Sequence, residues 1–177
     1  MPASGRKPVP DTELYATALA RLARRAHSVY EMRQALERRS NDRAAVRRVL
    51  ERLKQEKLLD DARYARQFAR FRSESRRQGP FRIARDLRVR GVPDRDIQPA
   101  LEELASGTDE SRIVRLRIER QLSALRAPLN ERKVASLYRN LLRAGFSADV
   151  IHTELRELTR GRISDIAKES AEDEESD

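Results

Sequence analysis

Residues His27 and Ser28 lie close to Glu31 in the stretch LARRAHSVYEMRQALERRS, residues 22–40. A histidine beside a serine is a pair that hydrolases use to activate a nucleophile. That chemistry also needs an acid that orients the histidine and a Gly-rich turn that stabilises an oxyanion, and neither accompanies this pair. The four residues from Ser28 to Glu31 fit an S-x-x-E capping box, which predicts a helix that begins at Val29. We interpret the pair as a structural corner between two helices.

Asp60 and Asp61 are the second candidate functional group, because adjacent carboxylates can bind a metal ion. They also stand where a helix is expected to start, so an N-cap and a first-turn charge explain them. The chain has no Cys, and its two His residues lie far apart, at 27 and 152, which argues against a zinc site. The sequence has no Walker loop and no H-E-x-x-H motif. We therefore expect no metal, no cofactor and no enzymatic activity.

Arginine is the third and most abundant candidate group. Residues 61–90 contain ten Arg and three acids, a net charge of +7. Projected as a helix, residues 61–77 place the aromatic side chains opposite an arginine stripe. The stripe consists of Arg63, Arg66, Arg70 and Arg77, and the opposite side consists of Tyr64, Phe68 and Phe71. We expect the aromatic side chains to be buried in the core, in preference to forming an exposed base-stacking platform.

The next expected helix continues the arginine surface. Ile83 and Leu87 should face the core, which leaves Arg82, Arg85 and Arg88 outward. Together with Arg24 and Arg25 of the preceding arginine-rich helix, these residues and the stripe are our candidate partner-binding site. Guanidinium groups bind phosphates or carboxylates, and this part of the chain has too few acids to neutralise them. The alternative is a solvated, arginine-coated helical surface with no partner.

The elements that position these residues follow an internal repeat. Residues 32–53 align with 83–104 at an offset of 51, and a further offset of 54 reaches the third copy. Every matched position is aliphatic or Met. The matched sets are Met32, Ile83 and Leu137; Leu36, Leu87 and Leu141; Val46, Ile97 and Ile151; Leu50, Leu101 and Leu155; and Leu53, Leu104 and Leu158. Ser40, Gly91 and Gly145 occupy the corner of each copy, where a left-handed residue ends a helix.

Each copy also has a first helix upstream, expected at about 11–26, 61–77 and 109–126, with Asp11, Asp60 and Thr108 as caps. The sequence thus predicts an all-α fold, a tandem array of three three-helix repeats that is elongated and curved. The expected segments are a flexible N-terminus, three repeats and an acidic disordered tail, at 1–10, 11–58, 59–106, 107–162 and 163–177.

Charge is distributed unevenly along the chain. The whole chain carries +9, but residues 164–177 carry −6, which leaves +15 on residues 1–163. A body of that charge attracts polyanions, nucleic acid first. No stretch is apolar enough to cross a membrane, and MPASGRKPVP lacks the apolar region of a signal peptide, so we expect a cytoplasmic protein without a membrane partner.

Two stretches resemble the RecX family of regulatory proteins. RRAHSVYEMRQALERR resembles the signature of the family's first repeat, and LLDDARYARQFARFRSESRRQGPFRIARDLRVRGV resembles its middle repeat. The resemblance extends from about residue 14 to 105, and LLRAGFSADVI supports a third repeat. The positions that match in the middle repeat are Asp60-Asp61, Tyr64-Ala65, Gly79-Pro80, Ile83, Leu87 and Gly91.

The resemblance implies a non-enzymatic modulator of the RecA recombinase. Such proteins lodge in the groove of the RecA–DNA filament and restrain filament growth, strand exchange, ATP hydrolysis and RecA-assisted autocleavage of repressors in DNA repair and the SOS response. The expected partners are the RecA filament and single- or double-stranded DNA without sequence preference, and the expected state is a monomer. The alternative is a sequence-independent DNA-binding protein with an architectural or transcriptional role, because three-helix units also present helices to DNA.

Overall fold

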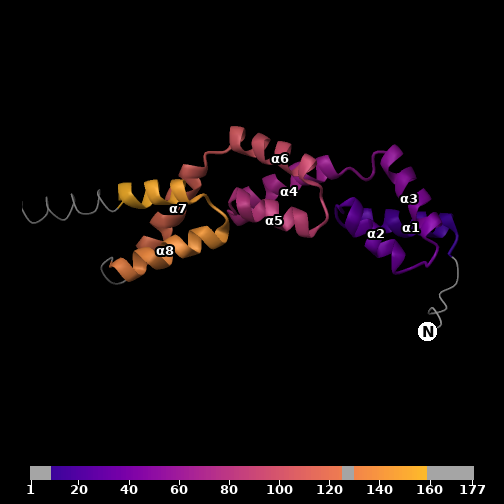
Figure 1. The fold of residues 1–177 in the computed structure, drawn as a ribbon, viewed down its shortest axis with the longest axis horizontal. Coiled ribbons are helices and arrows are strands. Elements are labelled where there is room, and N and C mark those ends of the chain that lie inside the picture. The colour runs from indigo at the N-terminus through magenta and orange to yellow at the C-terminus, as the bar shows by residue number, and fades with distance from the viewer. Residues whose placement is uncertain (1–8, 125–129, 159–177) are drawn as a thin grey trace, which may run out of the picture. The chain divides into compact units, whose positions relative to one another are not determined.

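The computed structural model describes residues 9–124 and 130–158. Within these ranges the chain forms helices and no strands, which confirms the all-α prediction (Figure 1). A further helical segment, 148–158, follows the eight labelled helices. The labelled helices are α1 Asp11–Leu22, α2 Val29–Glu37, α3 Arg43–Gln55, α4 Asp61–Arg76, α5 Pro80–Val89, α6 Asp94–Gly107, α7 Glu110–Ser123 and α8 Glu131–Ala144.

The chain divides into two compact units. The first comprises Met1–Phe71 and Ala84–Leu104, and the second comprises Arg72–Ile83 and Ala105–Asp177. The division falls inside α4, α5 and α6, so these three helices contribute residues to both units. The acidic tail predicted at 163–177 and most of the N-terminus predicted at 1–10 lie outside the described residues.

The first repeat has its own apolar core, built by α1, α2 and α3. Leu14, Met32, Leu36 and Leu53 are fully buried there. The spacing of Met32 and Leu36, i and i+4, places both on one face of α2. Asp42 caps α3, because its Oδ1 accepts hydrogen bonds from the backbone N–H groups of Ala44 and Ala45 at 2.9 and 3.0 Å. Local sequence signals and core burial therefore agree in this repeat.

Burial supports the repeat alignment. The first three matched sets are buried in every copy: Met32, Ile83 and Leu137; Leu36, Leu87 and Leu141; and Val46, Ile97 and Ile151. The last two sets are buried in the first repeat, at Leu50 and Leu53, but in the later copies Leu101, Leu104 and Leu158 are half-buried. The repeat pattern is therefore strongest around the corner between the second and third helices.

The glycines of the two later corners adopt the predicted left-handed conformation, with φ of +70° at Gly91 and +90° at Gly145. Ser40 does not adopt it, so the prediction for the first corner is wrong. Its backbone N–H bonds to the carbonyl of Leu36, and its Oγ accepts from the N–H of Asp42 at 3.1 Å. A side-chain hydrogen bond thus supports this corner in place of a left-handed residue.

The second unit has a separate core, formed by α7, α8 and the 148–158 helix. Val114, Ile118, Leu141 and Ile151 are fully buried in it. Close backbone contact joins the end of α8 to the start of α5, since the N–H of Gly79 donates to the carbonyl of Ala144 at 2.8 Å. A Cβ at Gly79 would lie 2.2 Å from the carbonyl oxygen of Gly145, so only glycine fits there.

Several predicted helix ends need correction. Asp60 caps α4 as predicted, because its Oδ1 accepts from the N–H of Arg63 at 2.8 Å. Asp11 is instead the first residue of α1, which follows Pro10 without a side-chain cap. Asp109 caps α7 in place of Thr108. α1 ends at Leu22 and not at residue 26.

The structure also differs from the prediction for residues 61–77 at one aromatic residue and at one arginine of the stripe. Phe71 was expected in the core, but 55% of its surface is exposed, whereas Tyr64 is buried and Phe68 is half-buried. The core is formed on this side by Tyr64, Ala65 and Ala69. Arg77 lies beyond the end of α4 with a φ of +49°, so it does not extend the helical stripe. Tertiary packing ended the helix one residue before the sequence pattern did.

Candidate partner-binding surfaces

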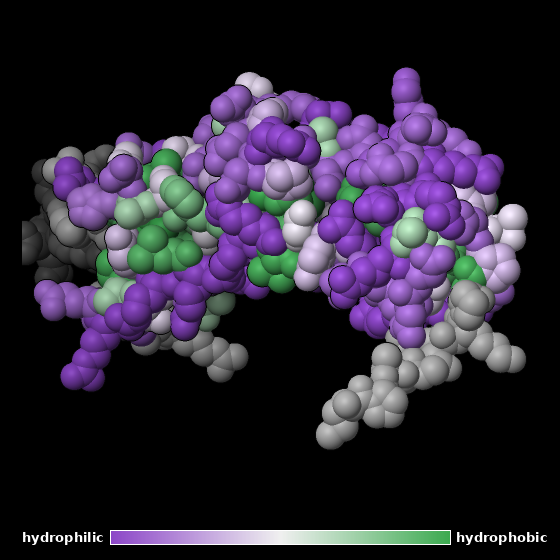
Figure 2. Space-filling view, turned by 45° about the vertical axis from the view of Figure 1, so that its right-hand side comes forward, coloured by the Kyte–Doolittle hydropathy of each residue, from purple (hydrophilic) through white to green (hydrophobic). Residues whose placement is uncertain are grey.

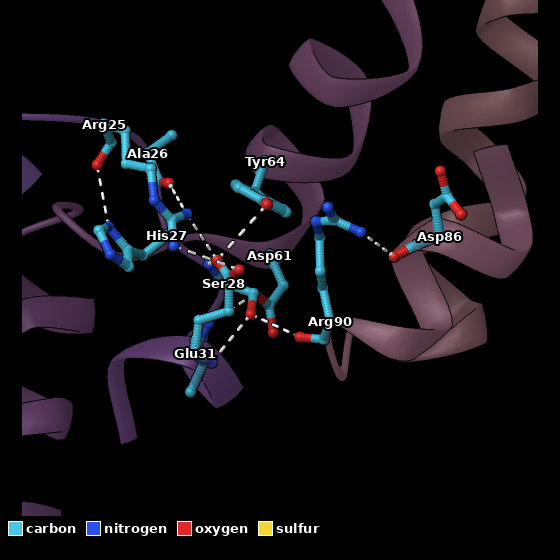
Figure 3. A network of polar contacts seen from close by, with 10 residues as sticks. Arg25, Ala26, His27, Ser28, Glu31, Asp61, Tyr64, Asp86 and Arg90 are labelled. Atoms are coloured by element: carbon cyan, nitrogen blue, oxygen red, sulfur yellow. Dashed lines mark hydrogen bonds and ion pairs between the residues drawn. The ribbon is translucent and has the colours of Figure 1, made fainter. Parts of the chain in front are cut away.

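The His27–Ser28 corner is structural, as predicted (Figure 3). The capping box is complete: the N–H of Glu31 donates to Ser28 Oγ at 3.1 Å, and the N–H of Ser28 donates to Glu31 Oε2 at 3.3 Å. Ser28 Oγ in turn donates to the carbonyl of Arg90 at 2.6 Å. The Nδ1 of His27 bonds to the carbonyl of Arg25 at 2.9 Å. The hydroxyl of Ser28 and the Nδ1 of His27 are therefore both used in the corner.

Asp61 completes this corner from another helix. Its Oδ1 accepts a hydrogen bond from the N–H of Val29 at 2.9 Å, so a residue of α4 caps the start of α2 (Figure 3). Burial raises the pKa of Asp61, and the hydrogen bond from Val29 offsets that only in part. Asp60 and Asp61 thus each have a capping role, on α4 and α2. No group of three or more His, Asp or Glu residues suited to a metal ion occurs among the described residues.

The arginines that α4 contributes to the first unit are exposed: Arg63, Arg66 and Arg70. Arg63 donates to the carbonyl of Lys57 at 2.7 Å. Arg66 lies 3.9 Å from Glu103, at the limit of an ion pair. Long, exposed pairs of this kind hold a guanidinium group only weakly. These side chains remain available to an anionic group on a partner.

Two further predicted arginines, Arg85 and Arg88, lie on the part of α5 that belongs to the first unit, and both are exposed. Arg88 forms an ion pair with Asp94 at 2.8 Å. Arg85 resembles Arg70 in being exposed on a helix that buries its apolar face. We refer to Arg63, Arg66, Arg70, Arg85 and Arg88 as the middle-repeat arginines.

Arg77 and Arg82 belong to the second unit, so the structure separates them from the middle-repeat arginines. Arg82 was expected to point outward but is half-buried, and one of its terminal nitrogens donates to the carbonyl of Arg143 at 3.3 Å. The carbonyl of Arg77 accepts a hydrogen bond from Arg117 at 2.8 Å. The predicted site residues are therefore distributed over both compact units.

Arg24 and Arg25 line a groove of about 650 Å3 in the first repeat, together with Arg21, His27 and Arg39. We call it the repeat-1 groove. Arg25 forms an ion pair with Glu31 at 3.0 Å, and Arg39 forms one with Glu13 at 3.0 Å. Burial lowers the pKa of His27, which disfavours its charged form in this groove. Acids of the same unit thus already bind two of the four arginines of this groove.

A second groove, of about 840 Å3, lies within the second unit. We call it the second-unit groove. Its charged lining consists of one acid, Glu74, and five cations, Arg76, Arg77, Arg117, Arg120 and Lys133. The sequence interpretation included Arg77 but not its neighbour Arg76, and it missed Arg117, Arg120 and Lys133 because it concentrated on residues 61–90. The available signal was the spacing of Arg117 and Arg120 on α7, which places them one turn apart.

The two grooves have chemistry suited to anion binding. Hydrophilic residues cover most of the face that Figure 2 shows, with apolar residues exposed in patches between them. In the described ranges, no helix has the length and apolar character needed to span a membrane. The fold and these surfaces define an all-helical repeat protein that exposes clustered arginines.

Comparison with known proteins identifies the family of this helical-repeat chain. Family models match residues 15–53, as the first three-helix domain of RecX, and residues 60–101, as the second. The regulatory protein RecX of Halorhodospira halophila is 43% identical over 135 residues, which cover 76% of this chain and 81% of the relative. That of Pseudomonas putida strain KT2440 is 37% identical over 135 residues, 76% of this chain and 84% of the relative. The chain therefore belongs to the RecX family of regulatory proteins.

Solved structures agree on the fold. A crystal structure of RecX from Lactobacillus salivarius superposes with a TM-score of 0.75, at 22% identity, and the match covers 84% of this chain and 96% of that one. A second structure, of a regulatory protein RecX, gives a TM-score of 0.73 at 21% identity over 81% of this chain and 71% of that one. The helical-repeat fold predicted from the internal repeat is thus the fold of these proteins.

Proposed function

We propose that this protein binds the RecA–DNA filament and restrains RecA, acting on recombinase, ATPase and coprotease activities in DNA repair and the SOS response. Membership of the RecX family and the resemblance of its first two repeats support this function. The observation that carries the proposal is the set of exposed middle-repeat arginines on α4 and α5, of which Arg66 and Arg70 are one helical turn apart. On this proposal the protein is a monomeric, cytoplasmic regulator and not an enzyme.

The middle-repeat arginines would act by charge pairing. Planar guanidinium groups bind carboxylates and phosphates through paired hydrogen bonds, and a RecA–DNA filament offers both kinds of anion. Arg66 has only a long contact with Glu103, and Arg70 is exposed on the same helix, so a partner gains contacts at these two positions without first breaking a short ion pair. Binding across several filament subunits would then oppose their rearrangement.

The test replaces Arg66 and Arg70 by Glu in the full chain. The matched control is Arg43→Glu with Arg47→Glu, because this pair is also exposed, also spaced by four residues and also in the first unit, but on α3. RecA ATP hydrolysis on single-stranded DNA is measured against protein concentration, and circular dichroism checks folding. We expect the α4 pair to need at least about tenfold more protein for half inhibition, and the α3 pair to behave as wild type. Equal inhibition by wild type and the α4 pair would overturn the proposal.

The second candidate function is sequence-independent DNA binding with an architectural or transcriptional role. The two arginine-lined grooves favour it, because their cations can bind the phosphates of any nucleic-acid sequence. The two functions separate in one comparison. Replacing Arg66 and Arg70 by Glu removes the inhibition of RecA under the first function, whereas under the second it leaves binding by the two grooves unchanged.

A further inference from the structure

Positively charged residues outnumber acids in the lining of the second-unit groove. Its five cations face a single acid, Glu74. Two other acids of the unit bind an arginine that does not line the groove: Arg115 forms ion pairs with Glu154 at 2.7 Å and with Glu157 at 2.8 Å. Among the α7 arginines, Arg115 forms these ion pairs, whereas Arg117 and Arg120 line the groove. The pairing leaves the groove with an excess of cations.

Arg117 is held in a fixed orientation at this groove. One of its terminal nitrogens donates to the carbonyl of Arg77 at 2.8 Å, which leaves its remaining N–H groups to face other partners. Burial lowers the pKa of Arg117, and the neighbouring guanidinium groups of Arg77 and Arg82 lower it further. Crowded cations repel one another, so an anion that binds among them relieves an unfavourable interaction.

The backbone at Arg77 contributes to the arrangement. Its φ of +49° is uncommon for a residue with a side chain and costs free energy wherever it occurs. This conformation follows the last residue of α4, and the carbonyl of Arg77 is the acceptor that fixes Arg117. The strained residue thus supplies both a cation and a positioning contact to the groove.

We propose that the second-unit groove is a binding site for the phosphodiester backbone of single-stranded nucleic acid, with Arg117 and Arg120 as the principal phosphate ligands. The site goes beyond RecA regulation by the middle-repeat arginines, because it lies in the other compact unit and needs no RecA. Arg76, Arg77 and Lys133 add further positive charge along the groove.

The chemistry of the lining favours a nucleic-acid strand over an acidic protein. A strand carries a negative charge at every nucleotide, so one ligand meets several of the five cations in succession. An isolated carboxylate meets only one or two of them. Apart from its charged residues, the groove is lined mainly by hydroxyl and amide side chains, such as Ser136, Gln121 and Asn140, which donate hydrogen bonds to phosphate oxygens.

The shape of the site favours one strand over a duplex. Proteins that read a duplex insert a protruding helix or ribbon into one of its grooves, whereas this site is itself concave. Its lining includes no aromatic residue, so bases have no ring to stack on. Binding should therefore depend strongly on salt and little on base sequence.

The test uses the full chain and a fluorescein-labelled oligo-dT of about 15 nucleotides, the upper range of a compact single-strand site. Fluorescence anisotropy gives Kd over a series of salt concentrations. The groove variant is Arg117→Gln with Arg120→Gln. The matched control is Arg112→Gln with Arg132→Gln, because these arginines are exposed on α7 and α8 and do not line the groove. Circular dichroism melting compares the folding of both variants with wild type.

We expect the groove variant to raise Kd at low salt by about tenfold, and the control to raise it by less than about threefold. The salt slope should flatten by about 1.4 in the groove variant, because each single-strand phosphate contact contributes about 0.7. Arg117→Lys, which keeps the charge but loses the planar fork, should give an intermediate Kd. Since Arg117 also bonds to Arg77, this second variant keeps the test valid if Arg117→Gln melts early.

If the groove variant and the control weakened the binding of oligo-dT equally, the proposed site would be overturned. Such a result would show that the affinity depends on the overall charge of the protein alone. A groove variant that binds oligo-dT like wild type would also overturn the site. Loss of binding to an oligoglutamate peptide with unchanged binding to oligo-dT would assign the groove to an acidic protein instead. A larger effect on a duplex of equal length would overturn the single-strand assignment. The assay contains no RecA, so its failure leaves RecA regulation untouched.

Discussion

The repeat-1 groove and the second-unit groove are lined by the same kind of side chain, but they differ in where their acids lie. In the repeat-1 groove, Glu31 and Glu13 hold Arg25 and Arg39 in ion pairs of 3.0 Å. In the second unit, Glu154 and Glu157 bind Arg115, which does not line the groove. Arginine content therefore does not distinguish a structural cluster from a binding cluster, whereas the placement of acids does.

This difference has an energetic meaning. An anion that enters the repeat-1 groove competes with carboxylates already in place, so part of its interaction energy replaces an existing one. An anion that enters the second-unit groove meets guanidinium groups that repel one another. The same ligand should thus bind the second-unit groove more tightly, although the two grooves have comparable numbers of cations.

The largest expected effect comes from Gly79→Ala, which would break the second-unit groove. The new Cβ would lie 2.2 Å from the carbonyl oxygen of Gly145, and the backbone must move to relieve the contact. Because Gly79 is two residues from Arg77, the groove should lose its geometry. We expect a loss of about 1–3 kcal/mol in the free energy of unfolding and weaker binding of oligo-dT.

The control for this substitution is Gly107→Ala, where an added Cβ meets nothing within 4 Å. It should leave both stability and binding close to wild type. Denaturant unfolding followed by circular dichroism gives the stability, and anisotropy gives the binding. Comparable losses in the two alanine variants would refute the role of the close contact at Gly79.

A smaller effect is expected from Ser28→Ala, which tests whether the corner beside the repeat-1 groove is purely structural. The substitution removes the N-cap of α2 and leaves the carbonyl of Arg90 without its donor. We expect it to lower the free energy of unfolding by about 0.5–2 kcal/mol. RecA inhibition and binding of oligo-dT should not change under conditions where the protein is folded.

Ser123→Ala serves as the control for Ser28→Ala, because the hydroxyl of Ser123 is exposed and bonds only within its own helix turn. Its unfolding free energy should stay within about 0.5 kcal/mol of wild type. If Ser28→Ala abolished RecA inhibition without changing its unfolding curve, the corner would be a functional site.

The smallest effect is expected from Glu13→Gln, which removes the ion pair of Arg39 and so makes the repeat-1 groove more like the second-unit groove. The affinity for oligo-dT at low salt should rise, by less than about threefold, and the difference should vanish at high salt. Glu51→Gln is the matched control, since it breaks the ion pair with Lys54, which does not line this groove. An identical rise in both variants would mean that net charge alone decides affinity.

The features that could be predicted from the sequence are those that depend on nearby residues. The capping box at Ser28, the cap at Asp60 and the left-handed glycines at 91 and 145 follow from residues within one turn of each position. The repeat pattern predicted the buried aliphatic positions, because apolar spacing fixes the inward face of a helix.

Features that depend on distant residues were not predicted. The exposure of Phe71 depends on which neighbours complete the core, and the end of α4 before Arg77 depends on packing that a helical projection ignores. The second-unit groove depends on the pairing of Arg115 with Glu154, 39 residues away. The role of Asp61 at the start of α2, 32 residues before it, was likewise invisible to a local interpretation.

The cap that Asp61 supplies to α2 limits how modular the repeats are. The N–H of Val29 and the hydroxyl of Ser28 find their partners at Asp61 and Arg90, both beyond the first repeat in the chain. A fragment cut at residue 58 would contain every helix of that repeat but would leave the start of α2 without these two partners. The repeats resemble one another in sequence, yet the first depends on residues of the next for two hydrogen bonds at the start of α2, so we expect the fragment to be less stable than the same repeat in the full chain.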